Sequence, residues 1–237
     1  MNTRLLFEQS QPFLSYLADW HARLPALDLA AELKEPQRAA VISEDLVKGF
    51  CTVGLLSSPR IQGVVTPAVR LVKRAHELGV PHLLLLQDTH EPDAVEFGSF
   101  PPHCIRGTEE SETVPELATL PFARQFTIIP KNSLNPALAL SFQDWLVRHD
   151  DVRTFIIVGD CTDLCVYQIA MALRVRANDL QRRNLRVIIP ADCVDTYDLS
   201  VDVARSVGAM PHAGDLLHLI FLYHMALNGI EVVATVD

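Results

Sequence analysis

A cysteine stands where an apolar strand is expected to turn into a helix. Residues 154–158 are short, apolar and β-branched, whereas residues 168–177 repeat apolar side chains at helical spacing. Cys165 therefore falls in or near the first turn of a helix, where unpaired amides and the helix dipole stabilise a thiolate. Because a thiolate attacks carbonyl carbons, Cys165 is a candidate nucleophile. A packed core cysteine is the alternative.

Two candidate residues, each following another expected strand, could complete a site for acyl transfer with this thiol. Asp45 follows the first apolar run and Lys131 follows the third, so both side chains are expected at one edge of the sheet with Cys165. A buried carboxylate with a raised pKa can take the thiol proton and return it to a departing amine. The lysine can hold that carboxylate and stabilise charge near the thiolate. A strand-ending aspartate and an exposed loop lysine are the alternative.

A group of oxygen and nitrogen ligands follows the second expected strand. Asp88 and His90 are two residues apart, so extended backbone directs both to the same side. Glu96 and His103 occur farther along the loop and could complete a mixed metal site of two carboxylates and two imidazoles. Solvated loop side chains are the alternative. Cys104 is expected to face away because it is the neighbour of His103.

A parallel sheet is needed to bring these side chains together. Apolar strand-like runs recur at about residues 38–43, 82–87, 125–130, 154–158, 185–190 and 230–235. Helical patterns separate them, at 66–78, at 136–149 and in long segments that start near residues 164, 199 and 214. The alternation predicts a three-layer α/β/α fold with a six-stranded parallel sheet. Residues 1–37 lack a strand and are expected to form a helical N-terminal extension of a single domain spanning 1–237.

The composition of the 237-residue chain suits one compact domain with a sizeable core. A net charge of −9 argues against wide contacts with nucleic acid or anionic membranes. The most apolar late segment, residues 216–227, is too short to cross a bilayer. Five cysteines without a repeating framework, and an N-terminus without a signal-peptide pattern, predict a reduced, cytoplasmic protein.

Taken together, these motifs resemble those of plant-type nicotinamidases in the isochorismatase-like cysteine hydrolase family. The similar stretches are residues 45–54 (DLVKGFCTVG), residues 88–112, which include PPHCIRGTEESE, and residues 161–166 (CTDLCV). They occur in the order that the family has, and the resemblance covers residues from about 38 to 235. It implies an isochorismatase-like fold and the hydrolysis of nicotinamide to nicotinate and ammonia through a thioester.

The resemblance also implies a role for each candidate in the acyl-transfer site. It makes Cys165 the nucleophile, Asp45 the general acid and base, and Lys131 the third member of a catalytic triad. The backbone amides of Cys161 and Cys165 are implied to hold the oxyanion, next to a cis peptide bond that precedes Cys161. The roles of the two cysteines therefore differ, because only the sulfur of Cys165 would react.

For the substrate ring and the metal, the resemblance implies further contacts. Phe50 and Phe100 correspond to aromatic residues that flank the pyridine ring in the family. The implied ligands of a divalent metal are Asp88, His90, Glu96 and His103. Zinc is expected first, and the oxygen-rich ligand set also admits iron or manganese.

Two departures from the family pattern leave alternatives open. Val47 stands where the family usually has glutamine, and Lys131 is followed by residues 132–134 (NSL) instead of a glycine-containing loop. The chain could instead be a family amidohydrolase for another carbamoyl or ureido compound, or a catalytically silent binding subunit with the same fold. The expected partners are a small-molecule amide and further copies of the chain in a homo-oligomer, with no nucleic acid and no membrane.

Overall fold

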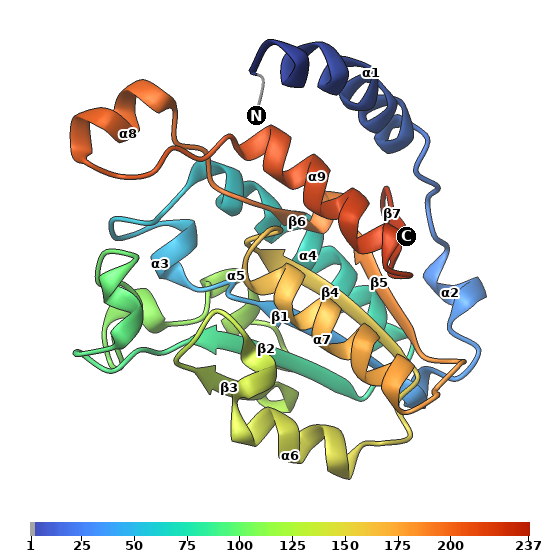
Figure 1. The fold of residues 1–237 in the computed structure, drawn as a ribbon. Coiled ribbons are helices and arrows are strands. Elements are labelled where there is room, and N and C mark those ends of the chain that lie inside the picture. Colours follow the sequence, from blue (N-terminus) through green and yellow to red (C-terminus); the bar gives the residue numbers. More distant parts are fainter. Residues whose placement is uncertain (1–2) are drawn as a thin grey trace.

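A parallel β-sheet forms the centre of the molecule in a computed structural model, which describes residues 3–237 (Figure 1). The strand order is β3-β2-β1-β4-β5-β7. These strands are β1 (Ala39–Glu44), β2 (His82–Asp88), β3 (Thr127–Lys131), β4 (Thr154–Asp160), β5 (Arg186–Pro190) and β7 (Glu231–Val233). A two-residue strand, β6 (Val194–Asp195), pairs with the end of β4. The predicted six-stranded parallel sheet is confirmed, with β6 as a short addition.

Helices cover both faces of this sheet and produce three layers (Figure 1). One face packs against α4 (Pro59–Glu77) and α5 (Pro115–Ala118), and the other against α6 (Leu140–Arg148), α7 (Cys165–Asp179) and α9 (Gly214–Leu227). All six residues of β1 are buried, with Val41 in the core beneath α4 and Ile42 in the core beneath α7. Burial on both faces explains why the strands are continuous apolar runs in the sequence.

Some helix boundaries differ from the predicted ones. Helix α4 begins at Pro59, well before residue 66, because the Ser58 side chain accepts a hydrogen bond from the Arg60 amide and proline suits the first helical position. The long helix expected near residue 199 is wrong. That segment forms only the seven-residue α8 (Val201–Val207), which ends at Gly208 with a left-handed φ of 72° and stands away from the sheet (Figure 1).

The N-terminal segment consists of α1 (Thr3–Ala22) and the short α2 (Leu29–Glu32). Helix α1 lies beside α9, where the Tyr223 ring contacts Phe13, Tyr16 and Trp20 with centroids 5.4–5.9 Å apart (Figure 1). Leu17 is fully buried, while Phe13 remains 46% exposed, so the apolar side of α1 is only partly covered. The assignment of residues 1–37 to a single domain with the rest stays a prediction. Within residues 3–237, no helix is both long and apolar enough to cross a membrane.

Strands β1 and β4 approach each other very closely at the edge of the sheet where the candidate residues gather. Gly159 pairs with Glu44 and has a φ of 115°, and a Cβ atom at this position would lie 1.8 Å from the Glu44 carbonyl oxygen. Only glycine fits there. The close approach brings Asp45, after β1, near the turn that follows β4.

Candidate active site

Lys131, the last residue of β3, lies at the centre of a buried cluster of charged groups. Its Nζ lies 2.7 Å from Asp45 Oδ2 and donates hydrogen bonds to Asp88 Oδ1 and, at 3.5 Å, to Cys165 Sγ. None of the four side chains is more than 4% exposed. The parallel register pairs Lys131 with Asp88, so the ends of β1, β2 and β3 bring these groups to one edge of the sheet. The structure thus brings together the three residues predicted as a triad.

Asp45 sits in a left-handed backbone conformation directly after β1. With a φ of 53°, the chain turns so that Asp45 Oδ1 accepts a hydrogen bond of 2.7 Å from the Asp88 amide. Burial, followed by the nearby Asp88 carboxylate, raises the pKa of Asp45 to about 6, although the Lys131 ammonium opposes the shift. Asp45 is therefore an ionised base above about pH 6 and can hold a proton more readily than an ordinary aspartate.

Cys165 is the first residue of α7, as the sequence pattern indicated. The turn before it is closed by hydrogen bonds from the Leu164 and Val166 amides to the Cys161 carbonyl, and the peptide bond between Asp160 and Cys161 is cis. In residues 3–237, the amides of Cys161 and Cys165 donate no hydrogen bond to a protein group. Two free donors next to a thiol are suited to an oxyanion.

The Cys165 thiol needs a base before it can attack. Burial raises its pKa well above the usual value, Lys131 acts to lower it, and the carboxyl groups of Asp45, Asp88 and Glu44 raise it further. The Cys165 Sγ and a carboxylate oxygen of Asp45 lie within 4.8 Å of each other. A short movement of the side chains therefore brings the carboxylate to the thiol proton. Lys131 itself remains protonated, because its carboxylate neighbours outweigh the effect of burial on its pKa.

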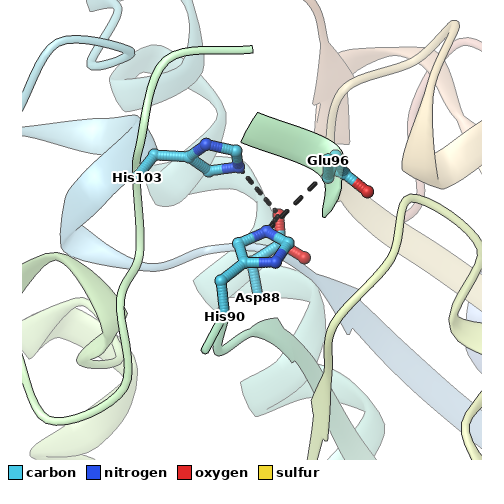
Figure 2. A group of neighbouring side chains, drawn as sticks. All are labelled: Asp88, His90, Glu96 and His103. Atoms are coloured by element: carbon cyan, nitrogen blue, oxygen red, sulfur yellow. Dashed lines mark ion pairs between the residues drawn. The ribbon is translucent and has the colours of Figure 1, made fainter. Parts of the chain in front are cut away.

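The four predicted metal ligands converge beside this cluster, as Figure 2 shows. Asp88 ends β2, His90 follows it, Glu96 lies in the short helix η2 (Val95–Gly98), and His103 comes from the loop beyond. The Nε2 atoms of His90 and His103 lie 3.4 and 3.6 Å from Asp88 Oδ2, and His90 Nε2 lies 3.9 Å from Glu96 Oε1. One ligand atom from each residue lies within 4.8 Å of the others.

The hydrogen bonds around these four residues fit a divalent cation. His90 Nδ1 lies 2.9 Å from Asn132 Oδ1, and His103 Nδ1 lies 2.8 Å from the Pro101 carbonyl. Since both partners are acceptors, each Nδ1 carries the proton and each Nε2 presents a lone pair to the cluster. Among the described residues, His90 Nε2 and Glu96 Oε1 are buried atoms without a hydrogen-bond partner. A cation at this point would satisfy both atoms.

The charge of Asp88 also suits a metal ligand. Burial acts to raise its pKa, but the Lys131 ammonium and the two nearby imidazoles hold that pKa well below the ordinary value. Asp88 is therefore ionised at all relevant pH values. It contacts the lysine through Oδ1 and the imidazoles through Oδ2, so one carboxylate joins the catalytic cluster to the metal-ligand group.

Three aromatic rings contact His103 beside this group. The ring centroids of Phe50, Phe97 and Phe100 lie 5.5, 5.6 and 6.3 Å from that of His103. Phe50 belongs to the short helix α3 (Lys48–Cys51), and the other two come from the loop after β2. The structure thus brings both phenylalanines that the resemblance singled out close to the candidate metal site. Phe97 is an addition that also contacts His90.

Sequence reasoning missed two polar neighbours of the site. Asn132, which holds His90, was noted only as a departure from the family loop, although its position after Lys131 could have suggested a role. Glu44 precedes Asp45 and is fully buried, but alternation along a strand assigns it to the opposite face of β1. The prediction for Cys104 is confirmed, since its Sγ lies 3.6 Å from the Glu110 carbonyl and outside the four-residue group.

Comparison with known proteins matches this fold. A family model described as the isochorismatase domain matches residues 39–214. Nicotinamidase 1 of Arabidopsis thaliana is 31% identical over 220 residues, which are 86% of this chain and 89% of the relative. The pyrazinamidase of Pyrococcus horikoshii, solved in complex with zinc, has a TM-score of 0.62 at 20% identity and covers 83% of this chain and 98% of its own. The N-carbamoylsarcosine amidase of Thermoplasma acidophilum has a TM-score of 0.56 at 23% identity, and the match covers 75% of this chain and 97% of the amidase.

The parallel sheet and the family match identify a hydrolase of the three-layer α/β/α type. The chain belongs to the isochorismatase family. The predicted fold class and the prediction that the chain is a hydrolytic enzyme of this family are therefore confirmed.

Proposed function

We propose that the protein hydrolyses nicotinamide to nicotinate and ammonia through a thioester on Cys165. The observation that carries this proposal is the contact of one buried ammonium, that of Lys131, with both Asp45 and Cys165 beside a group of metal ligands. The similarity to a curated nicotinamidase over most of the chain supports the choice of substrate.

The chemistry starts with proton transfer from Cys165 to the Asp45 carboxylate. The sulfur then attacks the carboxamide carbon, and the two C–N electrons remain with the departing nitrogen when the tetrahedral intermediate collapses. Asp45 returns its proton to that nitrogen, so ammonia leaves as a neutral molecule. Throughout these steps, Lys131 stays charged and stabilises first the thiolate and then the carboxylate.

The turn before α7 supplies the second part of the mechanism. The free amides of Cys161 and Cys165 are suited to hold the oxyanion in both tetrahedral intermediates. A water molecule then gives a proton to Asp45 and attacks the thioester carbon, and Asp45 reprotonates the departing sulfur. Each half of the reaction uses the same carboxylate, once as base and once as acid.

Asp88, His90, Glu96 and His103 would hold the divalent metal, for which we propose zinc. A bound metal would supply a Lewis acid suited to the ring nitrogen of the substrate. The rings of Phe50, Phe97 and Phe100 would then pack against the substrate ring. This arrangement favours an aromatic amide with a ring nitrogen over a linear amide.

The purified protein should contain about one divalent metal ion per chain, and His90→Ala should lose it because one of four ligands is removed. Metal analysis after dialysis measures the content directly. His224→Ala, which removes an exposed histidine outside the group, should keep the metal. Equal metal content in the two variants would contradict the assignment of the ligands.

Ammonia release from a panel of amides tests the proposed substrate. Nicotinamide and pyrazinamide should react at least about tenfold faster, by kcat/KM, than N-carbamoylsarcosine and butyramide, which equals about 1.4 kcal/mol of transition-state discrimination. Faster release from N-carbamoylsarcosine would favour the carbamoyl-specific alternative, for which the structural similarity to an N-carbamoylsarcosine amidase is the supporting observation. The absence of ammonia with every amide would favour a silent binding subunit, against which the contacts of Lys131 argue.

Two further properties belong to this proposal. All five cysteines are free thiols, which suits the reducing cytoplasm that we propose as the location of the protein. We also keep the prediction of a homo-oligomer, and sedimentation of the full chain measures its state.

A further inference from the structure

The side chain of Glu44 is a buried acid that the proposed mechanism does not use. It is 0% exposed, and within residues 3–237 neither of its carboxyl oxygens has a hydrogen-bond partner. Its Oε1 lies 3.5 Å from Lys131 Nζ. A carboxyl group placed in a core without a hydrogen bond is costly, so its position next to the central lysine calls for a physical explanation.

Glu44 and Cys165 stand at equal distances from the same ammonium. Both Glu44 Oε1 and Cys165 Sγ lie 3.5 Å from Lys131 Nζ, while Asp45 and Asp88 lie closer. An ammonium has three N–H groups, and the closest carboxylates occupy most of this capacity. Glu44 therefore competes with the Cys165 sulfur for the remaining hydrogen-bonding capacity of the ammonium.

A second metal ion would be the other explanation for this grouping, since atoms of Glu44, Asp45 and Cys165 lie within 4.8 Å of one another. The Lys131 ammonium already provides a positive charge in contact with all three groups. The structure therefore favours competition for the lysine over a second metal site.

We propose that Glu44 is a positioning residue that controls how much of the Lys131 ammonium is available to Cys165. As a neutral acid, Glu44 leaves the ammonium to the sulfur. As an anion, it attracts Lys131 and repels the developing thiolate. The inference rests on the proposed function only in taking Cys165 as the nucleophile, and it sets an upper pH limit for the reactivity of that residue.

The charges around Glu44 are consistent with a neutral acid at moderate pH. Burial, and then the neighbouring Asp45, raise the pKa of Glu44 well above its usual value, and Lys131 opposes them. The titratable or charged groups that act on Glu44 come from each element around it: Asp45 after β1, Asp88 on β2, Lys131 on β3 and Cys165 on α7. As pH rises, Glu44 ionises and the thiolate becomes less favourable.

The rate at which iodoacetamide alkylates Cys165, followed by peptide mass spectrometry across a pH series, tests this inference on the full chain. The rate should rise with pH at first and then level off as Glu44 ionises, because the Glu44 carboxylate lies 3.5 Å from the Lys131 ammonium. Glu44→Gln should continue to rise and should react about tenfold faster at the alkaline end, the factor that one pKa unit represents. The series is run with and without zinc, since a bound cation would alter the charge beside Asp88.

Asp160→Asn is the matched control. Asp160 is also a buried acid whose charge acts on Asp45 and Lys131, but it lies beside Cys161 and, within residues 3–237, forms no ion pair with Lys131. Neutralising Asp160 should change the alkylation profile less than neutralising Glu44 does. An unchanged profile in Glu44→Gln, or an equal gain in Asp160→Asn, would overturn the inference.

If Glu44→Gln does not fold, infrared spectroscopy of Asp160→Asn tests whether Glu44 is protonated, because this variant lacks the Asp160 carboxyl group. The carbonyl band of a protonated buried carboxyl should persist at neutral pH and disappear where the alkylation rate levels off. Absence of that band at neutral pH would refute the inference. Because alkylation consumes no amide, this result stands apart from ammonia release, and either can fail without the other.

Discussion

Replacing Cys165 with alanine should reduce ammonia release from nicotinamide by at least about 10⁴-fold. The substitution removes the only atom that forms the proposed covalent intermediate, whereas the oxyanion amides and the metal ligands remain. Metal content and the circular dichroism spectrum should not change, because Cys165 is not one of the four ligands. Steady-state kinetics and metal analysis of the same sample measure both effects.

Two other cysteines provide controls for this substitution. Cys193→Ala removes a buried thiol away from the Lys131 cluster and should have little effect on turnover. Cys161→Ala removes a sulfur but keeps the backbone amide, so this variant should lose far less turnover than Cys165→Ala. If Cys165→Ala retained turnover within about tenfold of the parent, the covalent mechanism would be refuted.

Lys131→Met should destabilise the protein by about 3–5 kcal/mol and also remove most activity, because breaking a buried ion pair leaves charge without compensation. Methionine has a side chain of similar length. Without the ammonium, Asp88 stays ionised in the core and Asp45 loses the positive charge next to it. Urea unfolding at neutral pH measures the free energy of unfolding, and ammonia release measures the activity.

Lys48→Met is the matched control for stability. Lys48 also joins two carboxylates, those of Glu109 and Glu112, but it lies at the surface, where water screens the charges. Its replacement should lower the stability much less than Lys131→Met. Equal losses in the two variants would show that burial of the Lys131 cluster is not what makes that lysine important.

The six main strands and the class of the fold could be predicted from the sequence, because the strands are short apolar runs and most of them are buried on both faces. The ends of the elements could not all be predicted. The start of α4 depends on Ser58 and Pro59, and the short α8 depends on a left-handed turn at Gly208. Such local contacts leave only a weak signal in hydrophobic periodicity.

The candidate residues followed from position and type. Asp45, Asp88 and Lys131 each lie at or directly after a strand end, and parallel strands bring their carboxyl ends to one edge. Phe97 and Asn132 were harder to predict, since they lie in the short helix η2 and in the loop after β3, where their contacts with His90 join segments far apart in the sequence. Loop conformation is set by these long-range contacts and not by a repeating pattern.

By itself, the sequence determined which side chains are available and predicted that they meet at one edge of the sheet, because the alternation of strands and helices is visible in local residue patterns. Only the tertiary structure decided how their charges are arranged. One ammonium is shared among Glu44, Asp45, Asp88 and Cys165, and each imidazole turns its Nε2 to the same point. These properties depend on distances of a few ångströms in a buried environment, where electrostatic interactions are strong and sequence spacing says nothing about them.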